Sequence, residues 1–182
     1  MKKLVVILGV MALVGGIVSV AGAGSTDTMT LKVSVTAPLD VTIYATEYDF
    51  GTVALNATSI SGTSTAVKNT SQDAVETYEL KVSPGASGWT IAGSSGGQNN
   101  VRIQAMWNSA VPASIPDNAA NDLDEAGKTC NGTNFGGGDE TYKGDSVPVG
   151  VEEYLWFKLW TPEQSTSEGT KEFYLTITAS LG

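Results

Sequence analysis

Histidine is absent from the sequence, and cysteine occurs only once, at Cys130. Without histidine the chain lacks the most common general base and the most common transition-metal ligand, which excludes Ser-His-Asp and Cys-His catalytic sets. A lone cysteine cannot form a disulfide within its own chain, so in a secreted protein it indicates a free thiol or a bridge to another molecule. A carboxylate pair such as Glu152 and Glu153 would point to opposite faces of a strand and could not serve one site. We therefore expect that the protein is not an enzyme.

Positively charged residues are also scarce. The sequence has 10 Lys and Arg against 19 Asp and Glu, and its formal net charge is −9. Phosphate backbones repel such a chain, so we expect no nucleic-acid partner. The acidity favours solubility and leaves carboxylates available to bind cations.

Only one long apolar run occurs, and it lies at the N-terminus. Two lysines precede the apolar stretch 4–20, and Ala21-Gly22-Ala23 follows it. A positive start, an apolar run and small residues at the cleavage position are typical of a secretory signal peptide. We predict that residues 1–23 are removed and that residues 24–182 form one domain, secreted outside the cell or held at its surface; an uncleaved N-terminal anchor is the alternative. Because no second apolar run follows, we expect no membrane span in the mature chain.

Apolar and polar residues alternate with a period of two along most of the mature chain. This period is typical of β-strands that bury one face. The alternation occurs in the segments 28–36, 40–45, 48–55, 63–71, 76–83, 88–94, 100–107, 153–160 and 171–181. They are short, rich in Thr, Val, Ile and Tyr, and separated by Gly, Pro, Asn and Ser turns. The pattern predicts an all-β protein, an antiparallel β-sandwich of about eight or nine strands, with residues 161–170 joining the last two strands as a hairpin.

A long acidic loop rich in Gly and Asn, residues 117–147, interrupts this alternation. Within it, Asn118–Lys128 is expected to form a helical turn or two. Carboxylates and carbonyls are the oxygen ligands that Ca²⁺ prefers, so the loop predicts a calcium site. The candidate ligands are Asp122, Asp124, Asp139 and Asp145. The alternative is a solvated acidic loop that binds no ion, and no other cofactor is indicated.

Three Asn-x-Ser/Thr sequences begin at Asn56, Asn69 and Asn131. In a secreted chain they are candidate glycosylation acceptors. The alternative is that they are chance matches in a chain rich in Ser, Thr and Asn.

The segment Tyr154–Trp160, YLWFKLW, is bulky on both faces of the expected strand. One face carries Leu155, Phe157 and Leu159. Trp156 and Trp160 lie on the other face, near Tyr174 if the last two strands pair. Exposed aromatic side chains stack on sugars or are buried by another chain. Three covers for this face remain open: a loop of the same chain such as 117–145, a second copy of the protein, or a polysaccharide.

The first predicted strand, residues 28–36, begins shortly after the expected cleavage site, and Pro38 separates it from the rest of the chain. A strand at a free terminus can leave its own sheet and complete a neighbour's, as in donor-strand complementation. Such an exchange satisfies unpaired backbone groups on both strand edges. The residues that would enter the neighbour are Met29, Leu31, Val33 and Val35. The alternative is a first strand that pairs within its own domain.

Three sequence motifs carry a resemblance to known families: YDFGTV at 48–53, STAVKNTSQDAVETYELKVS at 64–83 and GWTI at 88–91. They resemble secreted microbial immunoglobulin-like domains, and the Phe-Gly element is similar to that of spore-coat-U-like and fimbrial subunits. The overall plan, a leader followed by a regular strand and a sandwich containing Trp and Tyr, is similar to matrix fibre subunits of the TasA and camelysin type. This resemblance implies an immunoglobulin-like or jelly-roll-like sandwich that is a structural, non-catalytic surface protein.

The leading hypothesis from the sequence is an extracellular structural subunit that binds copies of itself and assembles into a fibre, pilus-like filament or coat. In this hypothesis the strand 28–36 is donated to a neighbour, and Trp156, Trp160 and Tyr174 lie at or near a subunit contact. The rival is a secreted carbohydrate-binding or adhesive module that uses the same tryptophans.

Overall fold

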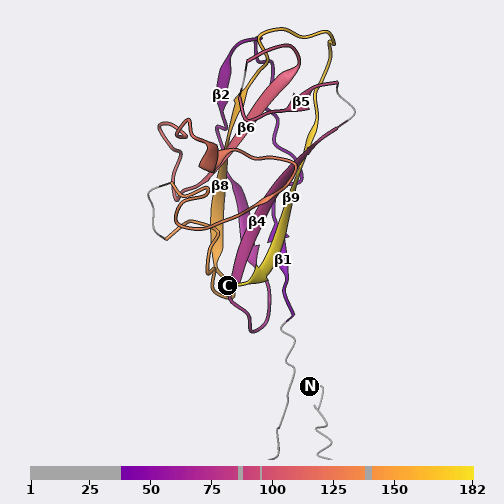
Figure 1. Ribbon diagram of the computed structural model, residues 1–182. Helices are drawn as coiled ribbons and strands as arrows, with labels where there is room; N and C mark the ends of the chain where they lie inside the picture. Colours follow the sequence, from indigo (N-terminus) through magenta and orange to yellow (C-terminus); the bar gives the residue numbers. More distant parts are fainter. Residues whose placement is uncertain (1–37, 86–87, 95, 138–140) are drawn as a thin grey trace, which may run out of the picture. The chain divides into compact units, whose positions relative to one another are not determined.

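The computed structural model describes residues 38–85, 88–94, 96–137 and 141–182. The predicted signal peptide and the predicted strand 28–36 lie outside these residues. The described part is all-β, with nine strands and one 3₁₀ turn (Figure 1). The strands are β1 (Val41–Ile43), β2 (Thr58–Ile60), β3 (Thr65–Asn69), β4 (Glu76–Pro84), β5 (Thr90–Ile91), β6 (Asn100–Trp107), β7 (Lys128–Thr129), β8 (Glu152–Trp160) and β9 (Phe173–Leu181), and the turn is η1 (Ala119–Asn121). No described helix has the length and apolarity that a membrane crossing requires.

The larger of the two sheets is built around β8. Its strand order is β1-β3-β8-β6-β5, and β2 pairs with the far end of β8 beyond β3. β6 lies on the other side of β8, with Trp107 opposite Leu155 and Arg102 opposite Trp160. The pairs are antiparallel except β5 with β6, which run parallel. β8 is therefore hydrogen-bonded along both edges.

The smaller sheet has the order β7-β4-β9. β4 and β9 pair antiparallel over their full length, from Glu76 opposite Leu181 to Pro84 opposite Phe173. The expected hairpin between the last two strands is therefore wrong, because β8 belongs to one sheet and β9 to the other. Nine residues of β9 find nine partners on β4, whereas both edges of β8 are already occupied by other strands.

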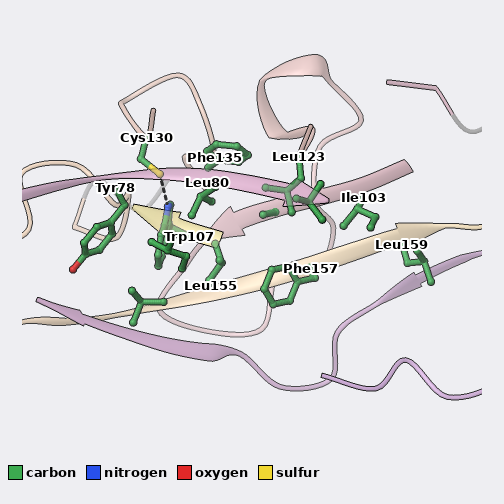
Figure 2. Packing of buried hydrophobic residues seen from close by; sticks show 14 of the residues in the cluster. Tyr78, Leu80, Ile103, Trp107, Leu123, Cys130, Phe135, Leu155, Phe157 and Leu159 are labelled. Carbon is green, nitrogen blue, oxygen red and sulfur yellow. Dashed lines mark hydrogen bonds between the residues drawn. The ribbon is translucent and has the colours of Figure 1, made fainter. Parts of the chain in front are cut away.

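Both sheets contribute to one large core (Figure 2). Its fully or nearly buried strand residues are Val67, Tyr78, Leu80, Val82, Val101, Ile103, Ala105, Trp107, Leu155, Phe157, Leu159 and Ile177. Their alternation on β4, β6 and β8 confirms the faces expected from the period of two. Two sheets that bury their apolar faces in a shared core make the architecture β-sandwich-like.

Two sequence segments differ from expectation. Residues 48–55 alternate like a strand but form no strand, and Phe50 and Val53 pack against the core from an irregular segment. The long loop forms η1 and the short β7, so the expected helical turn is present as a 3₁₀ turn. Asn118 caps this turn by accepting a hydrogen bond from the Asn121 N–H.

Candidate functional site

The second face of β8 is covered by the same chain. Trp156 is only 7% exposed and packs with Met106 and Ile115 in a small second cluster. Its indole N–H donates to the Asn108 carbonyl (2.9 Å), and the Lys158 ammonium donates to the Ile115 carbonyl (2.9 Å). Of the three covers left open for this face, the structure shows the first at Trp156, a segment of the same chain, and so Trp156 is not an exposed contact residue. The covering segment follows β6 and reaches Ile115, so it lies just before the loop that the sequence indicated.

Trp160 and Tyr174, the other predicted contact residues on β8 and β9, are more accessible. Trp160 is half-buried, and the Lys158 ammonium lies 4.7 Å from the centre of its ring in a cation–π contact. Tyr174 is 57% exposed on the outer face of β9. Because β8 and β9 are in different sheets, the structure does not join these two side chains into one platform.

Ion pairs to the buried Arg102 side chain hold the end of the covering segment in place. The Arg102 guanidinium on β6 binds both Asp117 and Asp122, with its Nε 2.7 Å from Asp122 Oδ1. Gln104 adds a hydrogen bond from its amide to the same Asp122 oxygen (3.0 Å). Burial alone would lower the pKa of Arg102, but the carboxylates of Asp122 and Asp117 raise it by more. The guanidinium therefore stays charged. A buried charge of this kind is stable only when it is paired, and this network pairs it.

The structure does not bring the predicted calcium ligands together. Asp122 is engaged by Arg102, Asp124 closes a turn by accepting from the Gly127 N–H (2.8 Å), and Asp145 accepts from the Thr77 hydroxyl (2.9 Å). Asp139 lies outside the described residues. Within the described ranges, no three Cys, Asp or Glu side chains form a group that could hold a metal ion.

The three candidate glycosylation sites have different surroundings. Asn56 and Asn131 are exposed in turns. Asn69 is fully buried: its amide donates to the Ala74 and Val147 carbonyls, and its oxygen accepts from Ser71. The folded domain leaves no room for a glycan on Asn69, so this prediction is wrong, and the Asn-Thr-Ser sequence serves a structural turn.

Cys130 is 1% exposed and accepts a hydrogen bond from the Trp107 indole N–H (3.2 Å; dashed line in Figure 2). Burial raises the pKa of the thiol to about 12. A neutral, enclosed thiol is unreactive, so the structure supports the free-thiol alternative over a bridge to another molecule.

A cleft of about 1050 Å³ lies between the two sheets. Its floor is made of core side chains at one end of the β-sandwich-like core, all buried except the half-buried Ile43: Ile43, Val82, Ile103, Leu123, Phe157 and Leu159. One rim is the irregular segment 45–53, and the other is the start of β9 with the residues that precede it, 169–175. The cleft therefore opens directly onto the hydrophobic core.

Aromatic and charged side chains line the rims of this cleft. Tyr48 packs edge-on against Phe50, with the two ring centres 4.8 Å apart. The Lys171 ammonium lies 5.6 Å from the centre of the Trp89 ring. The charged rim residues are Glu47, Asp49, Glu172 and Lys171. The rim is thus acidic overall, and the interior is apolar.

The cleft lies beside an open strand edge. At the two ends of the β4–β9 ladder, Gly85 N–H donates to the Glu172 carbonyl (2.8 Å) and Gly182 N–H donates to the Val75 carbonyl (3.0 Å). Hydrogen-bonded pairs alternate along an antiparallel ladder, so every second residue of β9 directs its N–H and C=O away from β4. These residues are Phe173, Leu175, Ile177, Ala179 and Leu181. Among the described strands, none pairs with this side of β9.

Sequence reasoning did not find this cleft. The interpretation of 48–55 as a strand would have closed this part of the fold, and the expected pairing of the last two strands would have covered β9. The available signals were the aromatic residues Tyr48, Phe50 and Trp89, which lie near Gly residues in the sequence and line the cleft.

Neither protein-family models nor curated proteins gave a match to this chain.

Proposed function

We propose that the protein is an extracellular structural subunit that assembles with copies of itself into a fibre, pilus-like filament or coat. The observation that carries this proposal is the cleft, with its floor of core side chains, beside the open edge of β9. A long unpaired strand edge is a template for another strand. In this proposal the two sheets are an immunoglobulin-like or jelly-roll-like sandwich that lacks one strand, and residues 28–36 supply it between subunits.

The dimensions of the cleft favour a polypeptide over a small ligand. Small-molecule sites typically enclose about 300–1,000 Å³ and carry a few converging polar groups. The volume of this cleft, about 1050 Å³, lies just above that range, and the side chains of its floor are apolar. Burying a Leu, Val or Met side chain there would contribute about 1.5–3 kcal/mol each, and the predicted strand presents four such residues on one face. The burial of these four side chains would therefore supply enough free energy for a stable contact between subunits.

A carbohydrate-binding or adhesive module is less well supported. Trp156 is buried under its own chain, so the expected pair of exposed tryptophans is reduced to the half-buried Trp160. The two proposals differ in solution behaviour: a structural subunit forms polymers whose length grows with concentration, whereas a binding module stays monomeric.

The test compares the mature chain, residues 24–182, with a chain that lacks residues 24–36. Light scattering after size-exclusion chromatography, over a range of concentrations, measures the mass, and negative-stain electron microscopy shows the particles. We expect polymers only from the longer chain.

A matched pair of variants keeps the chain length constant and tests whether assembly depends on the apolar side chains of residues 28–36. One variant replaces the four apolar residues with Ser: Met29, Leu31, Val33 and Val35. The control replaces the polar residues of the opposite face with Ser: Thr30, Lys32 and Thr36. Assembly should be lost only in the first variant. Equal assembly of the full and shortened chains, or monomers from both, would contradict the proposal.

A further inference from the structure

We infer that Asn131 is a site of spontaneous modification: in the folded protein its side-chain amide reacts with the backbone nitrogen of Gly132 and is converted to a carboxylate without an enzyme. This inference does not depend on the proposed function. It is carried by three features of the turn 130–135: an exposed Asn-Gly pair, a Gly132 nitrogen that is open to attack, and two backbone donors fixed on the Asn131 side-chain oxygen.

The Asn-Gly pair at 131–132 occurs once in the chain, and both residues are exposed. An added Cβ on Gly132 would find nothing within 4 Å, so no other group crowds this residue. Among the described residues, none accepts a hydrogen bond from the Gly132 N–H. The nitrogen can therefore lose its proton to solvent, and a glycine has no side chain that would hinder ring closure.

The Asn131 side-chain oxygen already has the partners that the reaction requires. It accepts hydrogen bonds from the backbone N–H groups of Thr133 and Asn134, each at 2.8 Å. Attack on the side-chain carbonyl carbon places a negative charge on this oxygen, and preorganised donors aimed at such a charge act as an oxyanion hole. A hydrogen bond to a charged oxygen is stronger than one to a neutral amide, so the donors stabilise the transition state more than the ground state.

Buried residues hold this turn at both ends. The Cys130 N–H donates to the Tyr78 carbonyl (2.8 Å), and the Phe135 carbonyl accepts from the Trp107 N–H (2.9 Å). Both Cys130 and Phe135 are in the core. The two donors are therefore held against the Asn131 oxygen by the fold, whereas in an unfolded chain they would be free to move away from it.

The reaction balances with water as the only co-reactant. The Gly132 nitrogen gives its proton to hydroxide and attacks the Asn131 Cγ. The Cγ–Nδ2 bond then breaks, Nδ2 takes a proton from water and leaves as ammonia, and a five-membered succinimide remains. Water opens the ring at either carbonyl, which gives aspartate or isoaspartate at position 131. The aspartate keeps an oxygen that can accept from the same two N–H groups, so the turn persists with one more negative charge.

The experiment follows the mature chain, residues 24–182, during incubation at mildly alkaline pH, once folded and once unfolded in guanidinium chloride. Peptide mass spectrometry locates each converted asparagine, and an ammonia assay measures the total. We expect Asn131 to convert about tenfold faster in the folded protein than in the unfolded chain, because the oxyanion donors are in place only in the fold. Asn56 is the internal control, since it is exposed in a turn but is followed by Ala57, and it should not be accelerated by folding.

Three variants test the nucleophile and one donor. Gly132→Ala adds a methyl group that hinders ring closure, and the open space around Gly132 accommodates it. Thr133→Pro removes one N–H donor, and the matched control Thr133→Ala keeps this N–H while it removes the hydroxyl. In the folded state Gly132→Ala and Thr133→Pro should slow the reaction, and Thr133→Ala should leave its rate unchanged. If Thr133→Pro lowers the midpoint of unfolding, the folded and unfolded rates of the wild type decide the role of the donors.

Two outcomes would overturn the inference. Equal or slower conversion of Asn131 in the folded protein would show that the two N–H groups do not stabilise the reacting oxygen. Conversion of Gly132→Ala at the wild-type rate would show that the Gly132 nitrogen does not attack the side chain by the proposed route.

Discussion

Gly144 lies where one added methyl group would collide with the hydrogen-bonded pair of Trp107 and Cys130. Its φ is +65°, in the left-handed region that alanine disfavours. A Cβ at this position would lie 2.5 Å from Trp107 Nε1 and 2.9 Å from Cys130 Sγ. The neighbouring backbone is fixed, because the Gly144 carbonyl accepts from Tyr78 N–H (2.8 Å) and its N–H donates to Glu153 (2.6 Å).

Two costs add in the variant Gly144→Ala. The left-handed backbone costs alanine about 1–2 kcal/mol, and overpacking a well-packed core typically costs about 1–3 kcal/mol. We therefore expect the free energy of unfolding to fall by about 2–5 kcal/mol, a large share of the roughly 5–15 kcal/mol of a typical domain.

Two other glycines separate these costs. Gly150 has φ +77° and nothing within 4 Å of an added Cβ, so Gly150→Ala reports the backbone term alone, about 1–2 kcal/mol. Gly62 also has open space and lies outside the left-handed region, so Gly62→Ala should change stability by less than about 0.5 kcal/mol. Urea unfolding followed by tryptophan fluorescence measures all three. If Gly144→Ala costs no more than Gly150→Ala, the packing around Trp107 is not as described.

Two further predictions concern buried titratable groups. Burial, with the nearby Asp40 carboxylate adding to it, raises the pKa of Glu76 above its ordinary 4.5, so the folded state binds more protons and this group's contribution to stability falls as pH rises above 4.5. Glu76→Gln removes this titration. We therefore expect the free energy of unfolding of the variant, measured by urea titration, to rise relative to that of wild type between pH 4.5 and 7. If the two proteins show the same dependence of stability on pH, the raised pKa of Glu76 is contradicted. The Cys130 thiol, with its raised pKa and 1% exposure, should resist an aromatic disulfide reagent at pH 8 until urea unfolds the protein; full labelling of the folded protein would show that the thiol is accessible.

The faces of the central strands could be predicted from the sequence. In β4, β6 and β8 the residues that alternate as apolar are the ones in the core, such as Tyr78, Ile103 and Phe157. This succeeds because successive side chains on a strand point to opposite faces, a property of local backbone geometry. The alternation does not say what covers the other face, and on β8 that cover is Ile115, 41 positions before Trp156 and brought to it by the fold.

The roles of several polar residues could not be predicted, because their partners are distant in the sequence. Asp122 resembles a calcium ligand in its loop but is paired with Arg102, and Asn69 resembles a glycosylation acceptor but bonds the Val147 carbonyl. Burial decides both cases: a buried carboxylate or amide takes whatever partner the fold provides, since leaving it unpaired is costly.

The sequence by itself determined that the protein is all-β and which residues of its regular strands are apolar on one face, since both follow from a period of two along the chain. Only the tertiary structure decided which strands pair. It placed β9 against β4 instead of β8 and left residues 48–55 outside both sheets, and these choices open the cleft. Strand pairing depends on the competition among all edges in the folded protein, and no local stretch of sequence records the outcome of that competition.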